Sequence, residues 1–110
     1  MSAVRVKISA QASAEIEDAA LYFVEISVAV FDRFFKQLAD AKLHIANFPA
    51  SGLIRYAHEL NIPNLRYWAL RDFPYALFYI HDSAQCTVIR CAHLASDIPA
   101  SLREVLPTQH

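Results

Sequence analysis

The chain has 110 residues, of which 55% are hydrophobic and only 19% are charged. Its length suits one domain with a single core, and we assign residues 1–110 to one domain. The net charge of −1 provides no field that attracts nucleic acid, so we expect no direct sequence-specific DNA binding. No apolar run reaches the roughly 18 residues of a membrane span, and residues 1–9 lack the apolar core of a signal peptide. We therefore expect a cytoplasmic protein without membrane contact.

The first half of the chain predicts a strand and a helical hairpin. Residues 3–9 alternate apolar and polar side chains, which is the period-two pattern of a half-buried strand. From residue 10 the apolar residues recur at helical spacing, and Ser9 is suited to the N-cap. The pattern breaks near Ser27, and a second helical stripe then continues until Pro49 stops it. Two antiparallel helices are the expected result.

The second half predicts an antiparallel meander. Residues 50–64 contain the only glycine, Gly52, together with Pro63 and mixed polar residues, and we expect a loop there. Three strand-like runs follow, joined by turns short enough for hairpins: residues 65–71, 75–81 and 85–93. Together with the first strand, they predict an α+β fold with a four-stranded sheet. A short C-terminal tail or helix over residues 98–106 completes the chain.

The expected sheet is apolar on both faces. In residues 75–80 and 87–92 both alternating sets of side chains are largely apolar, as in a sheet that is covered on both sides. The helical hairpin covers only one of these faces. The other is covered either by residues 98–106, which form a short segment, or by another chain. The mean hydropathy of +0.23 favours another chain, and hence a protein partner.

The reactive side chains of the last strands do not match a metal or hydrolase motif. His81, Cys86, Cys91 and His93 lack the paired spacing of a zinc site, so we expect no metal and no cofactor. Cys86 and Cys91 are five residues apart in one expected strand, an odd offset that places them on opposite faces as buried thiols without a disulfide. With one glycine, the chain has no G-x-S-x-G elbow and no glycine-rich phosphate loop.

Several short motifs follow one another in a characteristic order. Three weaker ones are Arg5-Val6-Lys7-Ile8-Ser9, Asn47-Phe48-Pro49 through Gly52, and Leu65-Arg66. Three more specific ones are Phe73-Pro74-Tyr75-Ala76-Leu77-Phe78-Tyr79, Val88-Ile89-Arg90 and His93-Leu94-Ala95-Ser96-Asp97-Ile98-Pro99. In this combination and element order, the chain resembles the RelE/ParE toxin superfamily over nearly its whole length. The motifs are most similar to those of ParE toxins.

The resemblance implies the toxin of a type II toxin-antitoxin system, of the kind also called plasmid stabilisation proteins. Such a toxin is neutralised by a ParD-like antitoxin, usually a ribbon-helix-helix DNA-binding dimer whose disordered tail folds around the toxin. ParE toxins characteristically poison DNA gyrase, here by protein-protein contact without catalysis. One departure is Ser96, because the family commonly has Arg before the Asp of this motif. An attenuated toxin that only binds its antitoxin and adjusts operator binding is therefore an alternative.

A ribosome-dependent mRNA endonuclease of the RelE type is a second alternative. It would need cations to stabilise a phosphorane and a group to move a proton. The candidates are Arg66 and the catalytic set Arg71, Arg90 and His93. Arg71 and Arg90 would converge on the sheet face away from the helices, with Tyr79 between them. The near-neutral charge disfavours this function, because such a toxin gains much of its affinity from phosphate contacts.

The same residues have ordinary structural explanations. The arginines would cap strand ends or pair with Asp72, Asp82 or Asp97, and Tyr79 would belong to the core with its hydroxyl at the edge. His93 would brace the following turn through Asp97. Most aromatic residues of the hairpin would be core, with a residual stripe for an antitoxin helix. For binding of antitoxin or target, the candidates are Arg66, Arg71, Tyr79, Arg90, His93, Asp97, Phe31 and Phe35.

Overall fold

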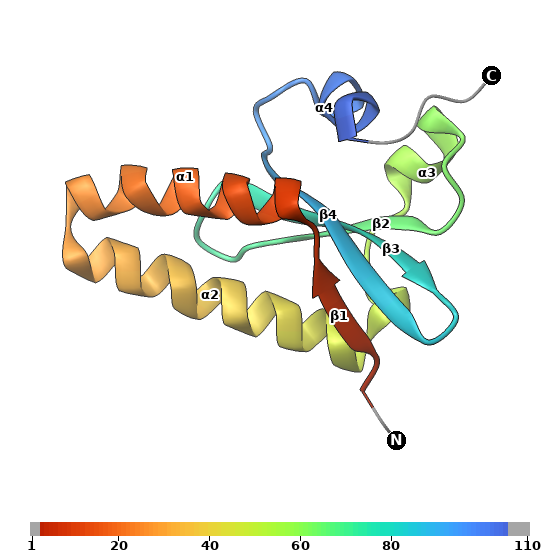
Figure 1. Cartoon of the computed structure of the whole chain (residues 1–110), viewed down its shortest axis with the longest axis horizontal. Helices are drawn as coiled ribbons and strands as arrows, with labels where there is room; N and C mark the ends of the chain where they lie inside the picture. Colours follow the sequence, from red (N-terminus) through yellow and green to blue (C-terminus); the bar gives the residue numbers. More distant parts are fainter. Residues whose placement is uncertain (1–2, 106–110) are drawn as a thin grey trace.

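The chain folds as a four-stranded sheet with a helical hairpin on one face and two short helices on the other (Figure 1). A computed structural model describes the backbone of residues 3–105 and the side chains of residues 3–103. The elements in chain order are β1 (Arg5–Ile8), α1 (Ala10–Ile26), α2 (Val28–Asn47), the 3-10 turn η1 (Pro49–Ser51), α3 (Arg55–Leu60), β2 (Leu65–Ala69), β3 (Tyr75–Asp82), β4 (Gln85–His93) and α4 (Ile98–Val105). This confirms the predicted α+β class. Residue 106, the end of the expected tail, lies outside the described residues.

The sheet has the strand order β1-β4-β3-β2. β2, β3 and β4 form the predicted antiparallel meander, and β1 pairs in parallel with β4 from Arg5 opposite Gln85 to Ile8 opposite Val88. The hairpin of α1 and α2 connects β1 to the rest of the chain and packs across one face of the sheet. In Figure 1 its turn projects beyond the ends of the strands.

Two serines define the ends of the hairpin helices. Ser9 is the N-cap of α1, and its Oγ accepts a hydrogen bond from the N–H of Ala12 at 3.1 Å. Ser27 ends α1 and begins α2, because its extended backbone interrupts the helix while its Oγ accepts from the N–H of Val30 at 3.0 Å. The predicted N-cap and the predicted break are both confirmed.

The expectation of a simple loop over residues 50–64 is wrong, because this segment contains most of η1 and all of α3. α3 has six residues and no side-chain cap at its N-terminus, and it ends at Asn61 in the left-handed conformation (φ 54°). So short a helix has little stability of its own. It forms here because Tyr56, Ala57 and Leu60 pack against the sheet.

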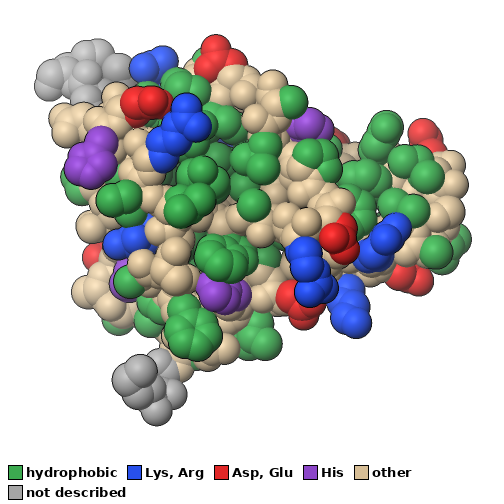
Figure 2. Space-filling model, turned by 180° about the vertical axis from the view of Figure 1, so that it is seen from behind, with side chains coloured by type: hydrophobic (Ala, Val, Ile, Leu, Met, Phe, Trp, Pro, Cys, Tyr) green, Lys and Arg blue, Asp and Glu red, His purple; other side chains and the backbone are tan. Residues whose placement is uncertain are grey.

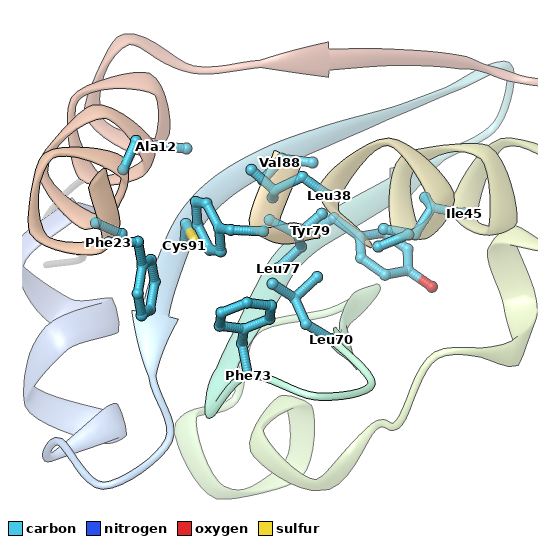
Figure 3. Close-up of a cluster of buried hydrophobic side chains, with 14 of the residues drawn as sticks. Ala12, Phe23, Leu38, Ile45, Leu70, Phe73, Leu77, Tyr79, Val88 and Cys91 are labelled. Atoms are coloured by element: carbon cyan, nitrogen blue, oxygen red, sulfur yellow. The ribbon is translucent and has the colours of Figure 1, made fainter. Parts of the chain in front are cut away.

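Each face of the sheet has its own apolar cluster. The larger lies under the hairpin and includes Phe23, Leu38 and Leu77 (Figure 3). The smaller contains Phe78 and Leu102 and joins the other face to α3 and α4. The expectation that another chain covers this second face is therefore wrong. Strand alternation makes both faces apolar, as predicted, but two short helices of the same chain cover the second one.

A β-bulge in β4 overturns the predicted placement of the cysteines. Tyr79 is opposite Val88 while Phe78 is opposite Arg90, so Ile89 is an extra residue in β4. One extra residue reverses the alternation of faces that follows it. Cys86 and Cys91 therefore both belong to the cluster under the hairpin, and not to opposite faces. Both are buried and free, as predicted.

Candidate functional site

Three of the sequence motifs meet around the side chain of Tyr79. This residue is fully buried under the hairpin (Figure 3). Its hydroxyl donates to the carbonyl oxygen of Pro49 at 2.7 Å. Arg66 Nη1 donates to the carbonyl oxygen of Gly52 at 2.9 Å. A Cβ atom on Gly52 would lie 2.9 Å from Arg66 Cβ and 2.9 Å from Tyr79 Cζ, and closer still to the tyrosine hydroxyl. Arg66 and Tyr79 thus hold the turn from Pro49 to Gly52 against the sheet.

Burial also determines the protonation of the groups under the hairpin. It raises the pKa of the Tyr79 hydroxyl, which therefore donates its proton to Pro49 at neutral pH. Burial and the nearby carboxylate of Glu15 raise the pKa of Cys91 to about 12. Burial raises the pKa of Cys86 as well. Both thiols are protonated at neutral pH and are therefore poor nucleophiles.

Arg90 is held by groups from two other elements, α1 and α4. Its Nε lies 2.5 Å from Oε2 of Glu15 in α1, and its Nη1 donates to the carbonyl oxygen of Ser101 in α4. Glu15 Oε1 also accepts from the N–H of Cys91 at 2.8 Å. The side chains of Arg90 and Glu15 are only 16% and 15% exposed. The partner of Arg90 is therefore Glu15, a residue that the sequence analysis did not single out.

The turn from β4 to α4 is closed by its own side chains. His93 Nδ1 accepts from the N–H of Ala95 at 3.0 Å, and Ser96 Oγ donates to the carbonyl oxygen of His93 at 2.6 Å. Asp97 Oδ1 accepts from the N–H of Ala100 at 3.2 Å and so caps the start of α4. His93 thus braces this turn through Ala95, whereas the sequence analysis expected Asp97 as its partner.

The expected convergence of Arg71, Arg90 and Tyr79 away from the helices is wrong. Tyr79 faces the hairpin, whereas Arg90 lies opposite Phe78 of the other face and pairs with Glu15 of α1. Arg71 is exposed beyond the end of β2 and lines an open pocket of about 400 Å³ with Trp68 and residues of α2. His93 lines a different pocket. The four side chains therefore do not form one centre.

The aromatic residues of the hairpin divide between core and surface. Phe23 and Phe34 are buried, and Phe31 is half-buried against the same cluster. Phe35 is 41% exposed, and the centroid of its ring lies 5.0 Å from that of Phe31. Tyr22 is exposed. Of the two candidates on α2, Phe35 therefore offers the larger accessible surface to a partner.

An apolar surface that the sequence analysis did not identify lies at the turn of the hairpin. We call it the hairpin-tip surface, and it consists of Leu21, Val24, Ile26 and Val28, of which Val28 is 67% exposed. Hydrophobic side chains also gather at the hairpin end of the face in Figure 2. Helices of 17 and 20 residues extend about 25 and 30 Å, so their junction projects past the sheet. The available sequence signal was that Leu21, Val24 and Ile26 extend the apolar side chains around α1, beyond its inner stripe.

The family of the chain follows from a comparison with protein-family models. The model for the ParE toxin of the type II toxin-antitoxin system parDE matches residues 6–98. The chain belongs to the ParE toxin family. The match extends from β1 to the first residue of α4, so it includes all four strands, the helical hairpin and α3.

The fold of this ParE-family chain is similar to that of a solved structure. A chain described as the chromosomal ParDE TA system from P. aeruginosa superposes with a TM-score of 0.63 and 11% sequence identity. The superposition covers 83% of this chain and 96% of that chain. At this identity the likeness establishes the shared fold. No curated protein sequence matches the chain.

The described part of the ParE-family chain contains neither a candidate membrane span nor a candidate metal site. Among its described residues, no helix is both long and apolar enough to cross a membrane. Within the same part of the chain, no three His, Cys, Asp or Glu side chains are grouped so as to hold a metal ion.

Proposed function

We propose that this chain is the toxin of a type II toxin-antitoxin pair, that a ParD-like antitoxin neutralises it, and that it inhibits DNA gyrase by protein-protein contact in the cytoplasm. The observation that carries the proposal is the match of the ParE toxin family over residues 6–98. The antitoxin would be a ribbon-helix-helix protein whose disordered tail folds on the toxin surface.

The positions of the candidate reactive groups support a toxin that acts by contact. Arg90 is engaged by Glu15 and Ser101, and Tyr79 is buried with its hydroxyl bonded to Pro49. Phosphoryl chemistry on RNA needs cations and a proton-transfer group around one reacting phosphate. Arg71 and His93 line different pockets, so this arrangement favours binding over ribonuclease chemistry.

The exposed apolar side chains support dependence on a partner. Both faces of the sheet are covered within the chain, yet the hairpin-tip surface remains open to solvent. A second exposed apolar group surrounds η1 and consists of Leu43, Phe48, Leu53 and Ile54. Several large apolar side chains exposed near one another in the chain are typical of protein interfaces. We expect the antitoxin to cover part of it in the neutralised complex.

An attenuated toxin is the second candidate function, and Ser96 favours it. Its hydroxyl donates to the carbonyl oxygen of His93 inside the turn before α4. No cation therefore extends from the position where the family commonly has arginine. Such a chain would retain antitoxin binding, and with it an effect on operator binding by the complex, while losing activity against the target.

Two parallel assays test these proposals. Purified chain is added to a gyrase supercoiling reaction, and separately to coupled translation with mapping of mRNA cleavage. We expect inhibition of supercoiling that disappears after incubation with the antitoxin-like protein encoded beside this chain. Unchanged supercoiling at high molar excess would overturn the gyrase proposal, and mRNA cleavage would establish the endonuclease instead. If Ser96→Arg inhibits gyrase and the natural chain does not, the chain is an attenuated toxin.

The antitoxin proposal has its own readout. Co-expression with the neighbouring protein should give a soluble complex, whereas the chain alone should associate through its exposed apolar surfaces. A well-behaved monomer that does not bind the neighbouring protein would overturn this part of the proposal, whatever the gyrase assay gives.

A further inference from the structure

An open pocket of about 450 Å³ lies between the C-terminal part of α1 and the nearby ends of β3 and β4. It is lined by Tyr22, Phe23, Ile26, Pro74, Tyr75 and His93. The rings form a continuous series, with centroid distances of 5.2 Å from Tyr22 to Phe23, 6.0 Å from Phe23 to Tyr75 and 5.1 Å from Tyr75 to His93. Tyr22 is 60% exposed, so a ligand can reach the pocket from solvent. We call it the aromatic pocket.

The flank of α1 that carries Tyr22 has carboxylates and no Lys or Arg. α1 contains four acidic residues and no Lys or Arg, and residues 72–89 also contain no Lys or Arg. Asp18 and Glu25 lie four residues before and three residues after Tyr22, so they share its flank of the helix. Both are exposed, and within residues 3–103 no ion pair engages either of them. This flank therefore presents negative charge beside aromatic rings.

The other carboxylates of α1 differ from these two. Glu15 is occupied by Arg90 and the N–H of Cys91. Glu17 is adjacent to Asp18 in sequence, but a step of one residue turns an α-helix by about 100°, so its side chain leaves the helix in a different direction. Arg33 lies over the ring of Phe73, at 5.9 Å from its centroid, and Phe73 does not line the aromatic pocket.

We propose that the aromatic pocket binds an arginine side chain of a protein partner. A guanidinium group stacks on aromatic faces, and its aliphatic stem covers apolar side chains such as Ile26 and Pro74. Asp18 and Glu25 supply the opposite charge at the rim. An acidic segment would be repelled there, and a purely apolar segment would leave the two carboxylates unused. Recognition of arginine by this pocket does not depend on inhibition of gyrase.

Binding of matched peptides tests the proposal. The probes are acetyl-Leu-Ala-Arg-Ala-Leu-amide and the same peptide with citrulline, which keeps the shape of arginine and removes its charge. Each is titrated into isotope-labelled full-length chain, and amide chemical shifts are followed by NMR. We expect the arginine peptide to shift Tyr22, Tyr75 and His93, and to bind about fivefold more tightly than the citrulline peptide.

Variants of the rim separate charge from shape. Asp18→Asn combined with Glu25→Gln should weaken binding of the arginine peptide about fivefold, because two exposed ion pairs are lost. Glu17→Gln makes the same type of charge change on the same helix, away from the pocket, and should leave the affinity unchanged. Tyr22→Leu retains an apolar side chain but removes the ring face, and should also weaken binding several-fold.

The proposal is overturned by any of three results. These are equal affinity for the arginine and citrulline peptides, chemical-shift changes confined to residues outside the pocket, and no saturable binding at millimolar peptide. Retained NMR dispersion in each variant shows that the fold is intact, so a loss of binding reports on the pocket.

Discussion

Replacing Gly52 with alanine tests whether the sequence motifs around Tyr79 form one structural unit. The backbone of Gly52 has φ −63° and ψ 154°, which alanine adopts freely, so any cost comes from space and not from backbone strain. The added Cβ would lie 2.9 Å from both Tyr79 Cζ and Arg66 Cβ, and closer to the tyrosine hydroxyl. Tyr79 is fully buried under the hairpin and has little freedom to move aside.

The magnitude follows from two contributions. Inserting a carbon atom into a packed site typically costs about 1–3 kcal/mol of unfolding free energy. Displacing the Tyr79 hydroxyl also breaks its bond to the Pro49 carbonyl, which costs about 1–3 kcal/mol when a buried group loses its partner. We therefore expect Gly52→Ala to lower the free energy of unfolding by about 2–6 kcal/mol.

Urea denaturation followed by circular dichroism measures this loss, and a second substitution tests its cause. Tyr79→Phe removes the hydroxyl that is nearest to the new Cβ. The double variant should then be less destabilised than the sum of the single variants by about 1 kcal/mol, because the same hydrogen bond is lost in both. Ala50→Ser enlarges an exposed residue of the same turn and should change stability by less than about 0.5 kcal/mol.

Two results would refute this reasoning. A Gly52→Ala variant with the stability of the natural chain would show that the turn moves away from Tyr79 at little cost. Strict additivity in the double variant would show that the alanine acts through something other than the tyrosine hydroxyl.

Three further predictions concern the groups under the hairpin. Glu15→Gln should lower the free energy of unfolding by about 3 kcal/mol in urea denaturation, because it leaves the largely buried Arg90 without its ion pair. Glu17→Gln changes an exposed carboxylate of the same helix and is the control. Equal effects of the two substitutions would contradict this account. Burial raises the pKa of Cys91 from 9.0 to about 12. The contribution of the protonated thiol to the free energy of unfolding is therefore fully present below pH 9. It should fall as the pH rises from 9 towards 12, by up to about 1.4 kcal/mol per pH unit for this group. Cys91→Ala should reduce that slope, and equal stability at pH 8 and pH 11 would exclude the effect. Both thiols should react with Ellman's reagent only as fast as the chain unfolds, and rapid modification of the native protein would show that Cys86 or Cys91 is accessible.

Local patterns in the sequence predicted much of the fold. Period-two and helical spacing located all four strands and both hairpin helices, because each pattern follows directly from which side of an element faces the core. Ser9 and Ser27 marked helix ends because a hydroxyl can accept the first free N–H groups of a helix. α3 was missed because its six residues form a helix only when they are packed on the sheet.

The candidate site was less predictable, because side-chain direction depends on contacts between distant segments. The bulge at Ile89 reversed the alternation in β4, which brought Cys91 under the hairpin and placed Arg90 opposite Phe78 of the other face. Arg90 nevertheless pairs with Glu15 of α1. Glu15 was not recognised as a partner, since nothing local links it to a residue 75 positions later in the chain. The projection of the hairpin tip likewise depends on where α1 and α2 cross the sheet.

The sequence by itself therefore determined the order of the elements, the two apolar faces of the sheet and the family resemblance. Each of these depends on residue spacing along the chain. Tertiary structure alone decided that α3 and α4 cover the second face, that Tyr79 and Arg90 are held by internal partners, and that Tyr22 and Tyr75 line one pocket beside acidic residues. These features join residues far apart in sequence, so they exist only once the chain has folded.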